Sequence, residues 1–345
     1  MSRQRILLIG HPDGLLNWRL PLRVLVINVS LLVLCLLLAI AALCYGTLHL
    51  SLEQLFSALS GQAPESLMIV VTQWRLPRIT MALLLGGALG MSGAIFQSIT
   101  RNPLGSPDVI GFNMGAYTGA LITIILFSGG YYHIAIGALA GGLLSAVVIY
   151  LLAWRQGIVG FRLIIVGIAI SAVLVSTNTW LIITASVERA MDAAIWQAGS
   201  LNGLTWQKSQ PAIVFIGLAA SAALLMSKRL QLLEMGDDAA QALGVNAESS
   251  RMWLMLFGVT LTAAATATAG PISFIALAAP QIARRLTGQS SVTLTSSALV
   301  GAALLLGVDT ISQPLFAPIQ LPVGVVTVSI GGLYLIWLLI RESHR

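Results

Sequence analysis

"VLVINVSLLVLCLLLAIAALCYGTLHLSL", residues 24–52, contains no charged side chain. A helix needs about 20 mostly apolar residues to cross the hydrocarbon core of a bilayer, and this run is longer. It is also too long for the apolar core of a signal peptide, so we expect a retained transmembrane helix. The whole chain is 57% hydrophobic and 9% charged, with a mean hydropathy of +0.91. Because soluble domains carry about 25% charged residues, we predict an all-α polytopic membrane protein.

Further charge-free runs follow along the chain, and some are too long for one span. The run at 109–154 is interrupted by "SGGYYH" (128–133), and the run at 252–283 by Gly270-Pro271, where a helix is expected to break. Three prolines in "ISQPLFAPIQLP" (311–322) place a loop before the last span. The pattern therefore predicts about ten transmembrane helices, at 24–47, 72–98, 109–127, 133–154, 163–184, 210–227, 252–269, 271–288, 293–311 and 323–340.

The basic residues are distributed unevenly between the gaps that separate these spans. With the N-terminus inside, 14 of the 18 lysines and arginines fall on the inner side, and the outer gaps hold Arg75, Arg78, Arg189 and Lys208. Cytoplasmic segments of membrane proteins carry the excess of basic residues. We therefore predict that both termini are cytoplasmic. Membrane orientation also accounts for the net charge of +6, so nucleic acid is not expected as a partner.

We expect one membrane domain at 24–340, with a cytoplasmic N-terminal segment at 1–23 and a cytoplasmic tail at 341–345. Two connecting segments have helix-like patterns of their own. "SVERAMDAAIWQA" (186–198) lies on the outer side and includes Trp196, which suits a periplasmic helix at the membrane interface. The second connecting segment, 228–250, lies on the inner side and is predicted to be a cytoplasmic coupling segment.

The inner segment contains "LLEMGDDAAQALGV" (232–245), with three of the 12 acidic residues of the chain. Asp237 suits the N-cap of a short helix, and Gly244 suits its C-terminal cap. A helix that lies on lipid is normally basic, because the inner leaflet is anionic. An acidic helix is repelled by that surface, so we predict that a protein partner contacts it. Its apolar face is expected to consist of Met235, Ala239, Ala242 and Leu243.

The chain contains no G-x-x-x-x-G-K-[ST] phosphate loop. It is therefore expected to be a non-catalytic transport subunit that conducts passively, uses an ion gradient or depends on a separate ATPase. Asp309 is the sole acid well inside a predicted span, which makes it a candidate proton site. Plain interfacial solvation is an equal alternative, because Asp309 lies near the outer end of its span beside Thr310 and Ser312. A single acid without a basic partner in the membrane is thin support for a proton-coupled carrier. A passive channel is disfavoured because no selectivity filter is evident.

Two motifs flank the second span. Arg75 and Arg78 in "TQWRLPRIT" (72–80) are three residues apart, which places them on one face of a helix at the outer surface. They either anchor the helix at the interface, which position alone favours, or dock an acidic partner. "RNPLGSPDVIGF" (101–112) has two prolines and two glycines and cannot be a regular helix. Irregular backbone near a bilayer must be buried or line a cavity, so we predict a gate here.

Several stretches together resemble the FecCD-type permeases of ABC importers for iron-siderophores, haem and cobalamin. The similarity covers the chain from about residue 50 to its end and is closest to the catecholate branch of the family, the ferric-enterobactin permease subunits. The stretches are "WRLPR" (74–78), "SGAIFQSITRNPLGSPDVIGFNMGA" (92–116), "GSLNGLTW" (199–206), "LLEMGDDAAQALGV" (232–245), "GPISFIALAAPQIARRLTG" (270–288) and "QLPVGVVTVSIGG" (320–332).

The resemblance implies a FecCD/cobalamin-permease-like fold in the bacterial inner membrane. It implies import of a ferric siderophore from the periplasm by alternating access. The implied partners are a cytoplasmic ABC ATPase dimer that carries ATP and Mg, a periplasmic siderophore-binding protein and a second permease. A paralogous heterodimer is favoured over a homodimer. No cofactor or metal is expected on this chain itself.

The resemblance also assigns roles to individual residues. It implies that Arg75 and Arg78 engage acidic residues of the binding protein, and that Asn102, Pro103 and Leu104 form a cytoplasmic gate. The segment implied to sit in a cleft of the ATPase contributes Leu233, Glu234, Met235, Asp237, Asp238, Ala239, Leu243 and Gly244. Gln281 stands where the family often has a histidine, and the loop before the last span lacks an arginine found in some relatives.

Other cargoes of the family remain alternatives, namely haem, cobalamin and hydroxamate or citrate siderophores. A proton-coupled secondary carrier is a less favoured one. The sequence shows no cluster of charged or aromatic residues that defines a ligand pocket, and none is expected, because a conduit for a bulky ligand works best when it binds weakly.

Overall fold

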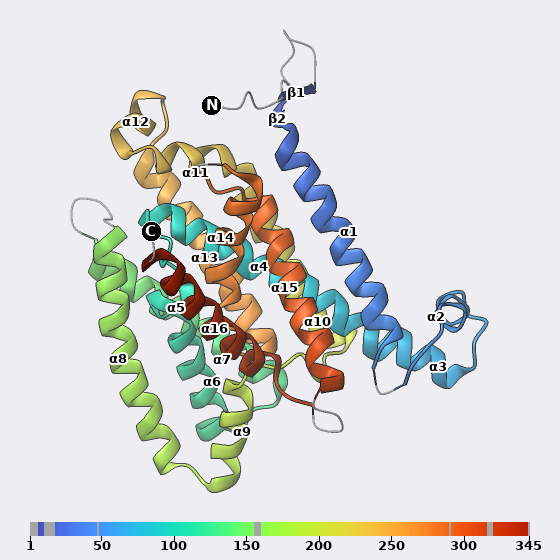
Figure 1. Ribbon diagram of the computed structural model, residues 1–345. Helices are drawn as coiled ribbons and strands as arrows, with labels where there is room; N and C mark the ends of the chain where they lie inside the picture. The colour runs from blue at the N-terminus through green and yellow to red at the C-terminus, as the bar shows by residue number, and fades with distance from the viewer. Residues whose placement is uncertain are drawn as a thin grey trace.

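The computed structural model describes residues 6–9, 18–46, 48–154, 160–289, 291–315 and 320–343. Parts of the predicted N-terminal segment and tail, and Arg155 between the fourth and fifth predicted spans, lie outside these ranges. The described residues form a bundle of helices (Figure 1). One short antiparallel strand pair, β1 (Ile6–Ile9) with β2 (Trp18–Pro21), precedes the first helix. The prediction of an all-α chain is therefore confirmed for the membrane domain, and the strand pair is an addition to it.

The long helices follow the hydropathy pattern, because local apolar content decides where a chain can enter a bilayer. A helix lies at each predicted span. These helices are α1 (Leu22–Cys44), α4 (Leu76–Thr100), α6 (Phe112–Phe127), α7 (Tyr131–Ala153), α8 (Gly160–Thr184), α10 (Trp206–Leu225), α13 (Ala247–Ala269), α14 (Ile275–Thr287), α15 (Leu294–Leu315) and α16 (Val323–Ser343).

Seven helical stretches in the described part of the chain are long and apolar enough to cross a membrane. Helices α6 and α14 are shorter, as is the apolar part of α16 at Val323–Tyr334. Helix α14 has 13 residues, about 20 Å, against a hydrocarbon core of about 30 Å. Its predicted span at 271–288 begins with irregular backbone, and Phe274 has a φ of 79°. The count of ten crossings stays a prediction.

Short helices connect the long ones. They are α2 (Leu52–Leu59), α3 (Glu65–Ile69), the π-helix η1 (Val70–Arg75), α5 (Pro107–Ile110), α9 (Val187–Gln197), α11 (Ser227–Glu234) and α12 (Asp237–Ala242). Helix α9 occupies the predicted interfacial helix at 186–198, and Gly199 just beyond it has a φ of 66°. Helices α2 and α3 have no counterpart among the predicted elements, and η1 overlaps the start of the predicted span at 72–98.

The helices at the centre of the bundle are α4 and α13. In their most apolar windows 78% and 72% of the residues are buried, against 17% in α1 and 11% in α8. A helix that is apolar all round and buried is interior to a bundle, whereas α1 and α8 present apolar side chains outward. Lipid or another membrane subunit is the environment that suits those outward faces.

Helices α4 and α15 approach each other closely at a pair of glycines. A Cβ atom added at Gly86 would lie 2.4 Å from the carbonyl oxygen of Gly301, and one added at Gly301 would lie 2.2 Å from that of Gly86. At the adjacent Gly87 the nearest atom would be 3.6 Å away, which is ordinary contact. Small residues allow membrane helices to pack backbone against backbone. The glycine-rich stretch at 86–93 thus serves packing, as its composition suggests.

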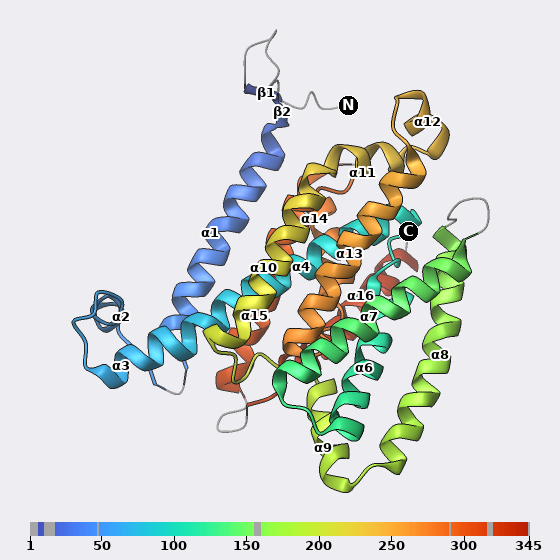
Figure 2. The same ribbon diagram turned by 180° about the vertical axis from the view of Figure 1, so that it is seen from behind.

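The bundle has two distinct ends (Figures 1 and 2). The β1–β2 pair, α11 and α12 lie at one end, and α16 runs back towards it, while α2, α3 and α9 lie towards the other. We call these the inner end and the outer end, following the orientation that the basic residues predict.

Candidate functional site

At the inner end, Asp237 connects three helices through its side chain. One carboxylate oxygen of Asp237, Oδ1, accepts hydrogen bonds from Arg101 at 2.7 Å and from Arg251 at 2.7 Å. Arg101 is the C-cap of α4, Asp237 begins α12, and Arg251 belongs to α13. Arg101 also donates to the carbonyl oxygen of Leu233 at 3.0 Å. The acidic segment is thereby fixed to the end of the central helix α4.

The charge around Asp237 holds its carboxyl group ionised. Partial burial by itself would raise the pKa of Asp237, but the hydrogen bond and charge of Arg251, with those of Arg101, outweigh it. The pKa is therefore below its ordinary value. Arg251 is 8% exposed, whereas Arg101 and Asp237 are half exposed, so the Arg251 pair is the better shielded from solvent.

Glu234 forms a second connection beside the first. Its carboxylate accepts a hydrogen bond from Ser98 of α4 at 2.6 Å and lies 3.4 Å from Arg284 of α14. It also accepts from the backbone N–H of Val292, just before α15, at 3.3 Å. Glu234 is mostly buried, at 16% exposed. A single side chain of α11 thus gathers the inner ends of three membrane helices.

The predicted gate residues lie next to this network. Asn102, Pro103 and part of α4 line an inner cavity of about 230 Å³ together with Arg101, Glu234 and Arg284. The Asn102 side chain accepts from the backbone N–H of Leu104 at 2.9 Å, and Leu104 is 54% exposed. The structure therefore brings the predicted gate and the predicted coupling segment together, although they are far apart in the sequence.

Gln281 has a defined position in this region. Its side-chain amide donates to the carbonyl oxygen of Pro103 at 2.9 Å, which ties α14 to the gate loop.

Residues 101–104 of the predicted loop are mostly exposed, and the chain is mostly buried from Gly105 onwards. The irregular backbone predicted for 101–112 is interrupted by the one-turn helix α5. Asp108 of α5 accepts a hydrogen bond from the Asn113 side chain at 2.6 Å and from the backbone N–H of Phe274 at 3.2 Å. Asn113 in turn accepts from Thr266 at 3.1 Å. The positive φ of Phe274 is a strained conformation for a non-glycine residue, and such strain occurs at functional sites. This link between the gate loop and the start of α14 was not predicted.

The acidic segment differs from the prediction in its local structure. It forms two helices, α11 and α12, separated at Gly236, whose φ of 122° ends the first. The N-cap of α12 is Gly236, so the N-cap role predicted for Asp237 is wrong. Asp237 instead turns its carboxylate to Arg101 and Arg251, which offer stronger, charge-assisted hydrogen bonds than backbone N–H groups.

The predicted coupling residues divide into exposed and buried ones. Met235 and Leu243 are 69% and 61% exposed, and Asp238, Ala242 and Gly244 are exposed as well. Ala239 is half-buried. Leu233 is buried and packs into the core of this chain, as does Ala240, which was not singled out. A surface for a partner therefore comprises the exposed set, whereas Leu233, Glu234 and Asp237 face their own protein.

At the outer end, Asp309 has the basic partner that the sequence analysis did not find. Arg78 donates two hydrogen bonds to its carboxylate, at 2.9 and 2.8 Å, and Gln313 donates a third at 3.1 Å. Asp309 is 1% exposed and Arg78 is 16% exposed. The description of Asp309 as an acid without a basic partner is therefore wrong, because α4 and α15 bring the two side chains together.

Arg75 and Arg78 do not act as a pair. Arg75 donates to the carbonyl oxygens of Leu43 and Leu48, both at 2.5 Å, whereas Arg78 turns to Asp309. Arg75 ends η1, a π-helix, so α-helical spacing does not hold across its junction with α4. The two guanidinium groups therefore bond to different elements, and the docking role of these residues stays a prediction.

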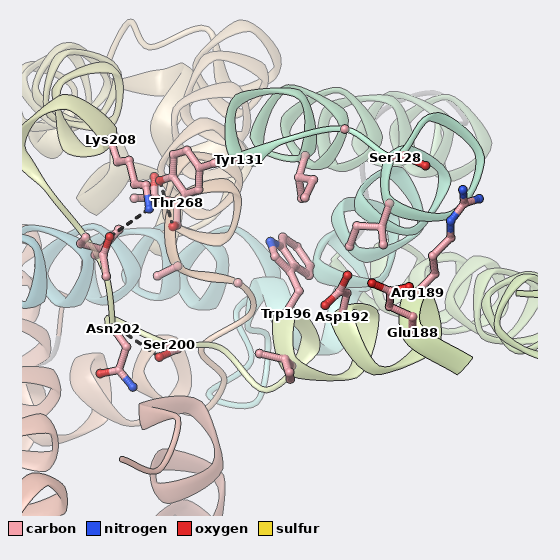
Figure 3. A pocket seen from close by; sticks show the side chains of 18 residues that line it. Ser128, Tyr131, Glu188, Arg189, Asp192, Trp196, Ser200, Asn202, Lys208 and Thr268 are labelled. Carbon is pink, nitrogen blue, oxygen red and sulfur yellow. Dashed lines mark hydrogen bonds between the residues drawn. The ribbon is translucent and has the colours of Figure 1, made fainter. Parts of the chain in front are cut away.

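The outer end also has a cavity of about 580 Å³, which the sequence analysis missed (Figure 3). Lys208 lies on one side, 5.0 Å from the centre of the Tyr131 ring, and donates to the carbonyl oxygen of Gly203 at 3.0 Å. The α9 residues Glu188 and Asp192 lie on the other side, and within the described residues neither forms an ion pair. The walls of the cavity therefore carry both acidic and basic side chains, which can bind a polar surface of a partner protein.

The residues of this cavity come from separate segments around 128–134, 188–208 and 268–270. Trp196 of α9 stacks on Tyr117 with ring centres 6.1 Å apart, which holds α9 against α6. The charged residues Glu188, Arg189 and Asp192 are a local signal in the sequence, but the sequence does not show that Lys208 and Tyr131 lie across a cavity from them.

Comparisons with known proteins agree with this geometry. The model of the FecCD transport family matches residues 32–341. The ferric enterobactin transport system permease protein FepG of Escherichia coli (strain K12) is 56% identical over 94% of this chain and 98% of its own length. The hemin transport system permease protein HmuU of Yersinia pestis is 34% identical over 91% of this chain and 95% of its own length.

A solved structure shares the fold. It is described as an inward-facing conformation of a metal-chelate type ABC transporter, and it is 28% identical to this chain. The superposition has a TM-score of 0.81 and covers 92% of this chain and 99% of the other.

Proposed function

Because this chain belongs to the FecCD transport family, we propose that it carries a ferric catecholate siderophore of the enterobactin type across the bacterial inner membrane. It is a membrane permease subunit of an ABC transporter. The support for this cargo is the 56% identity with a ferric enterobactin permease along nearly the whole chain. A separate ATPase dimer, a periplasmic binding protein and a paralogous second permease complete the proposed importer, with ATP and Mg on the ATPase.

The observation that carries the mechanism is the inner network around Asp237 and Glu234. The exposed residues of α12 and its flanks contact the ATPase, and their motion reaches α4 through Arg101 and Ser98. The gate residues 102–104 follow Arg101 directly in the chain, so a shift of α12 displaces the gate. Arg284 and Gln281 make α14 part of the same unit. The proposed device couples nucleotide-driven movement to opening of the inner cavity.

Uptake of different iron complexes tests the proposed cargo. In spheroplasts of a strain that lacks its own permease, supplied with the binding protein, this chain is expected to restore ⁵⁵Fe-enterobactin uptake at least tenfold. Ferric citrate, haemin and a ferric hydroxamate serve as matched cargoes. A strain that also lacks the ATPase is the control. Equal uptake of haemin would refute the catecholate assignment, and uptake that persists without the ATPase would refute the importer mechanism.

Docking of the binding protein is expected to depend on Arg75. Arg78 is occupied by Asp309, whereas the Arg75 guanidinium is bonded to neutral carbonyls and keeps its full charge for an acidic partner. The Arg75→Gln variant is expected to lower stimulation of ATP hydrolysis by the binding protein several-fold in proteoliposomes. Lys208→Gln, at another outer cation, is the control. Equal losses in both variants would show unspecific attraction and contradict a docking role of Arg75.

A further inference from the structure

Helix α2 at the outer end has two chemically different faces. At 3.6 residues per turn, its apolar residues fall within one arc of roughly 160°. These are Leu52, Leu55, Phe56, Ala58 and Leu59. The remaining arc carries Glu53, Gln54 and Ser57, followed by the C-cap Ser60. A capping box between Ser51 and Gln54 begins the helix and makes it a well-defined element.

The protein buries only one edge of this apolar arc. Leu55 and Ala58 are 3% and 2% exposed and belong to the main core, and α2 as a whole contacts α1, α3 and η1. Leu52, Phe56 and Leu59 are 57%, 69% and 48% exposed. Three large apolar side chains in contact with water at consecutive turns are unfavourable, since each forgoes a large part of the roughly 1.5–3 kcal/mol that full burial contributes. The stripe Leu52–Phe56–Leu59 therefore needs an apolar environment.

The position of α2 identifies that environment. Helices α2 and α3 project sideways from the bundle next to the outer end of α1 (Figures 1 and 2). Helix α1 is a membrane span whose outward side chains are apolar, and α2 begins eight residues after it ends. Tyr45 and Trp74, beside α2 at the end of α1 and in η1, are 61% and 62% exposed. Aromatic residues of this kind gather at the membrane–water interface.

We propose that α2 lies in the outer face of the lipid bilayer, with Leu52, Phe56 and Leu59 inserted among the lipid chains. Its apolar stripe lies beside the outer end of the membrane span α1, and its polar arc faces water. The helix carries one acid and no base, so apolar burial and not charge holds it there. Because α2 packs on η1, this attachment fixes η1 with its last residue Arg75, and the start of α4 that follows it, at a constant depth.

Accessibility of spin labels in lipid nanodiscs tests this inference. The two native cysteines, Cys35 and Cys44, are first replaced by alanine, and uptake is measured to confirm that the protein is intact. Labels are then placed singly by Leu52→Cys, Phe56→Cys and Leu59→Cys. Glu53→Cys and Ser60→Cys, on the polar side of the same helix, are the matched controls. Collisions with oxygen report lipid, and collisions with a nickel chelate report water.

The expected result is a several-fold higher ratio of oxygen to nickel collisions at 52, 56 and 59 than at 53 and 60, for the permease without binding protein. Equal ratios at all five positions would show that the stripe lies in water and would overturn the proposal. Protection of 52, 56 and 59 from both reagents would also overturn it, because it would mean that a protein surface covers the stripe. The measurement does not depend on which iron complex is transported.

Discussion

The variant Asp309→Asn is expected to lose about 3–5 kcal/mol of stability, because it leaves the guanidinium of Arg78 inside the protein without its counter-ion. The two side chains join α4 to α15, and the Asp309 carboxylate is almost completely buried. An isolated buried charge is far more costly than the pair is favourable, so removal of one partner has the larger effect. Apparent Tm in nanodiscs is expected to fall by several degrees, and uptake is expected to fall with it.

A double variant separates the missing charge from the missing contacts. In Arg78→Leu with Asp309→Leu, no charge is left behind, and well-packed apolar residues can replace a buried pair at little cost. We expect most of the lost Tm to return in this double variant. If Asp309→Asn alone kept the Tm of the original protein, the ion pair would not be a structural element of the outer end.

The same variants test the proton-carrier alternative. A proton site must be free to release and accept its proton, whereas the carboxylate of Asp309 is occupied by three hydrogen bonds, two of them from Arg78. The carrier model predicts that Asp309→Asn removes gradient-driven uptake and leaves stability unchanged. Uptake that requires the ATPase, together with a large loss of Tm, is the result that the Arg78–Asp309 pair leads us to expect.

The helices of the membrane domain were predictable because their signal is local. Twenty apolar residues in a row are visible in the sequence, and so are the glycine and proline that separate α13 from α14. The short acidic helix was predictable as well, but with Asp237 as its N-cap, whereas in the structure Gly236 is the N-cap and Asp237 is the first residue of α12. Helix α2 was missed because it is short and adjoins a longer apolar run.

The contacts of the site were not predictable, since they join residues that are distant in the sequence. Arg78 and Asp309 are separated by 231 positions, and Arg101 and Asp237 by 136. Family resemblance placed the gate and the coupling segment on the inner side. It did not show which side chains connect them. That connection depends on how α4 crosses the bundle and on the turn after α11, and both are set by packing and not by local propensity.

Replacement of Asp237 by asparagine is expected to separate ATP hydrolysis from transport. The change weakens two charge-assisted hydrogen bonds, each worth roughly 1.5–3 kcal/mol in favourable cases. Asp237 is 42% exposed, so solvent screening lowers that value, and we take about 1.5 kcal/mol in total. Since 1.4 kcal/mol corresponds to tenfold in an equilibrium, uptake per ATP hydrolysed is expected to fall about tenfold.

Asp238→Asn is the matched control, because it removes the same charge from the next residue. Asp238 is exposed, and within the described residues no ion pair includes it. It therefore belongs to the surface available to the ATPase, whereas Asp237 belongs to the connection with α4. In the Asp237 variant, the ATPase is expected to co-purify and hydrolyse ATP normally while uptake falls.

In the Asp238 variant, any loss of uptake is expected to accompany weaker association of the ATPase, so the uptake per bound ATPase stays unchanged. Identical behaviour of the two variants would contradict the separate roles. Retained coupling in Asp237→Asn would mean that Glu234, with Ser98 and Arg284, carries the movement alone. The two neighbouring acids thus distinguish attachment of the motor from transmission of its movement to the gate, because only one of them reaches the helix that leads into it.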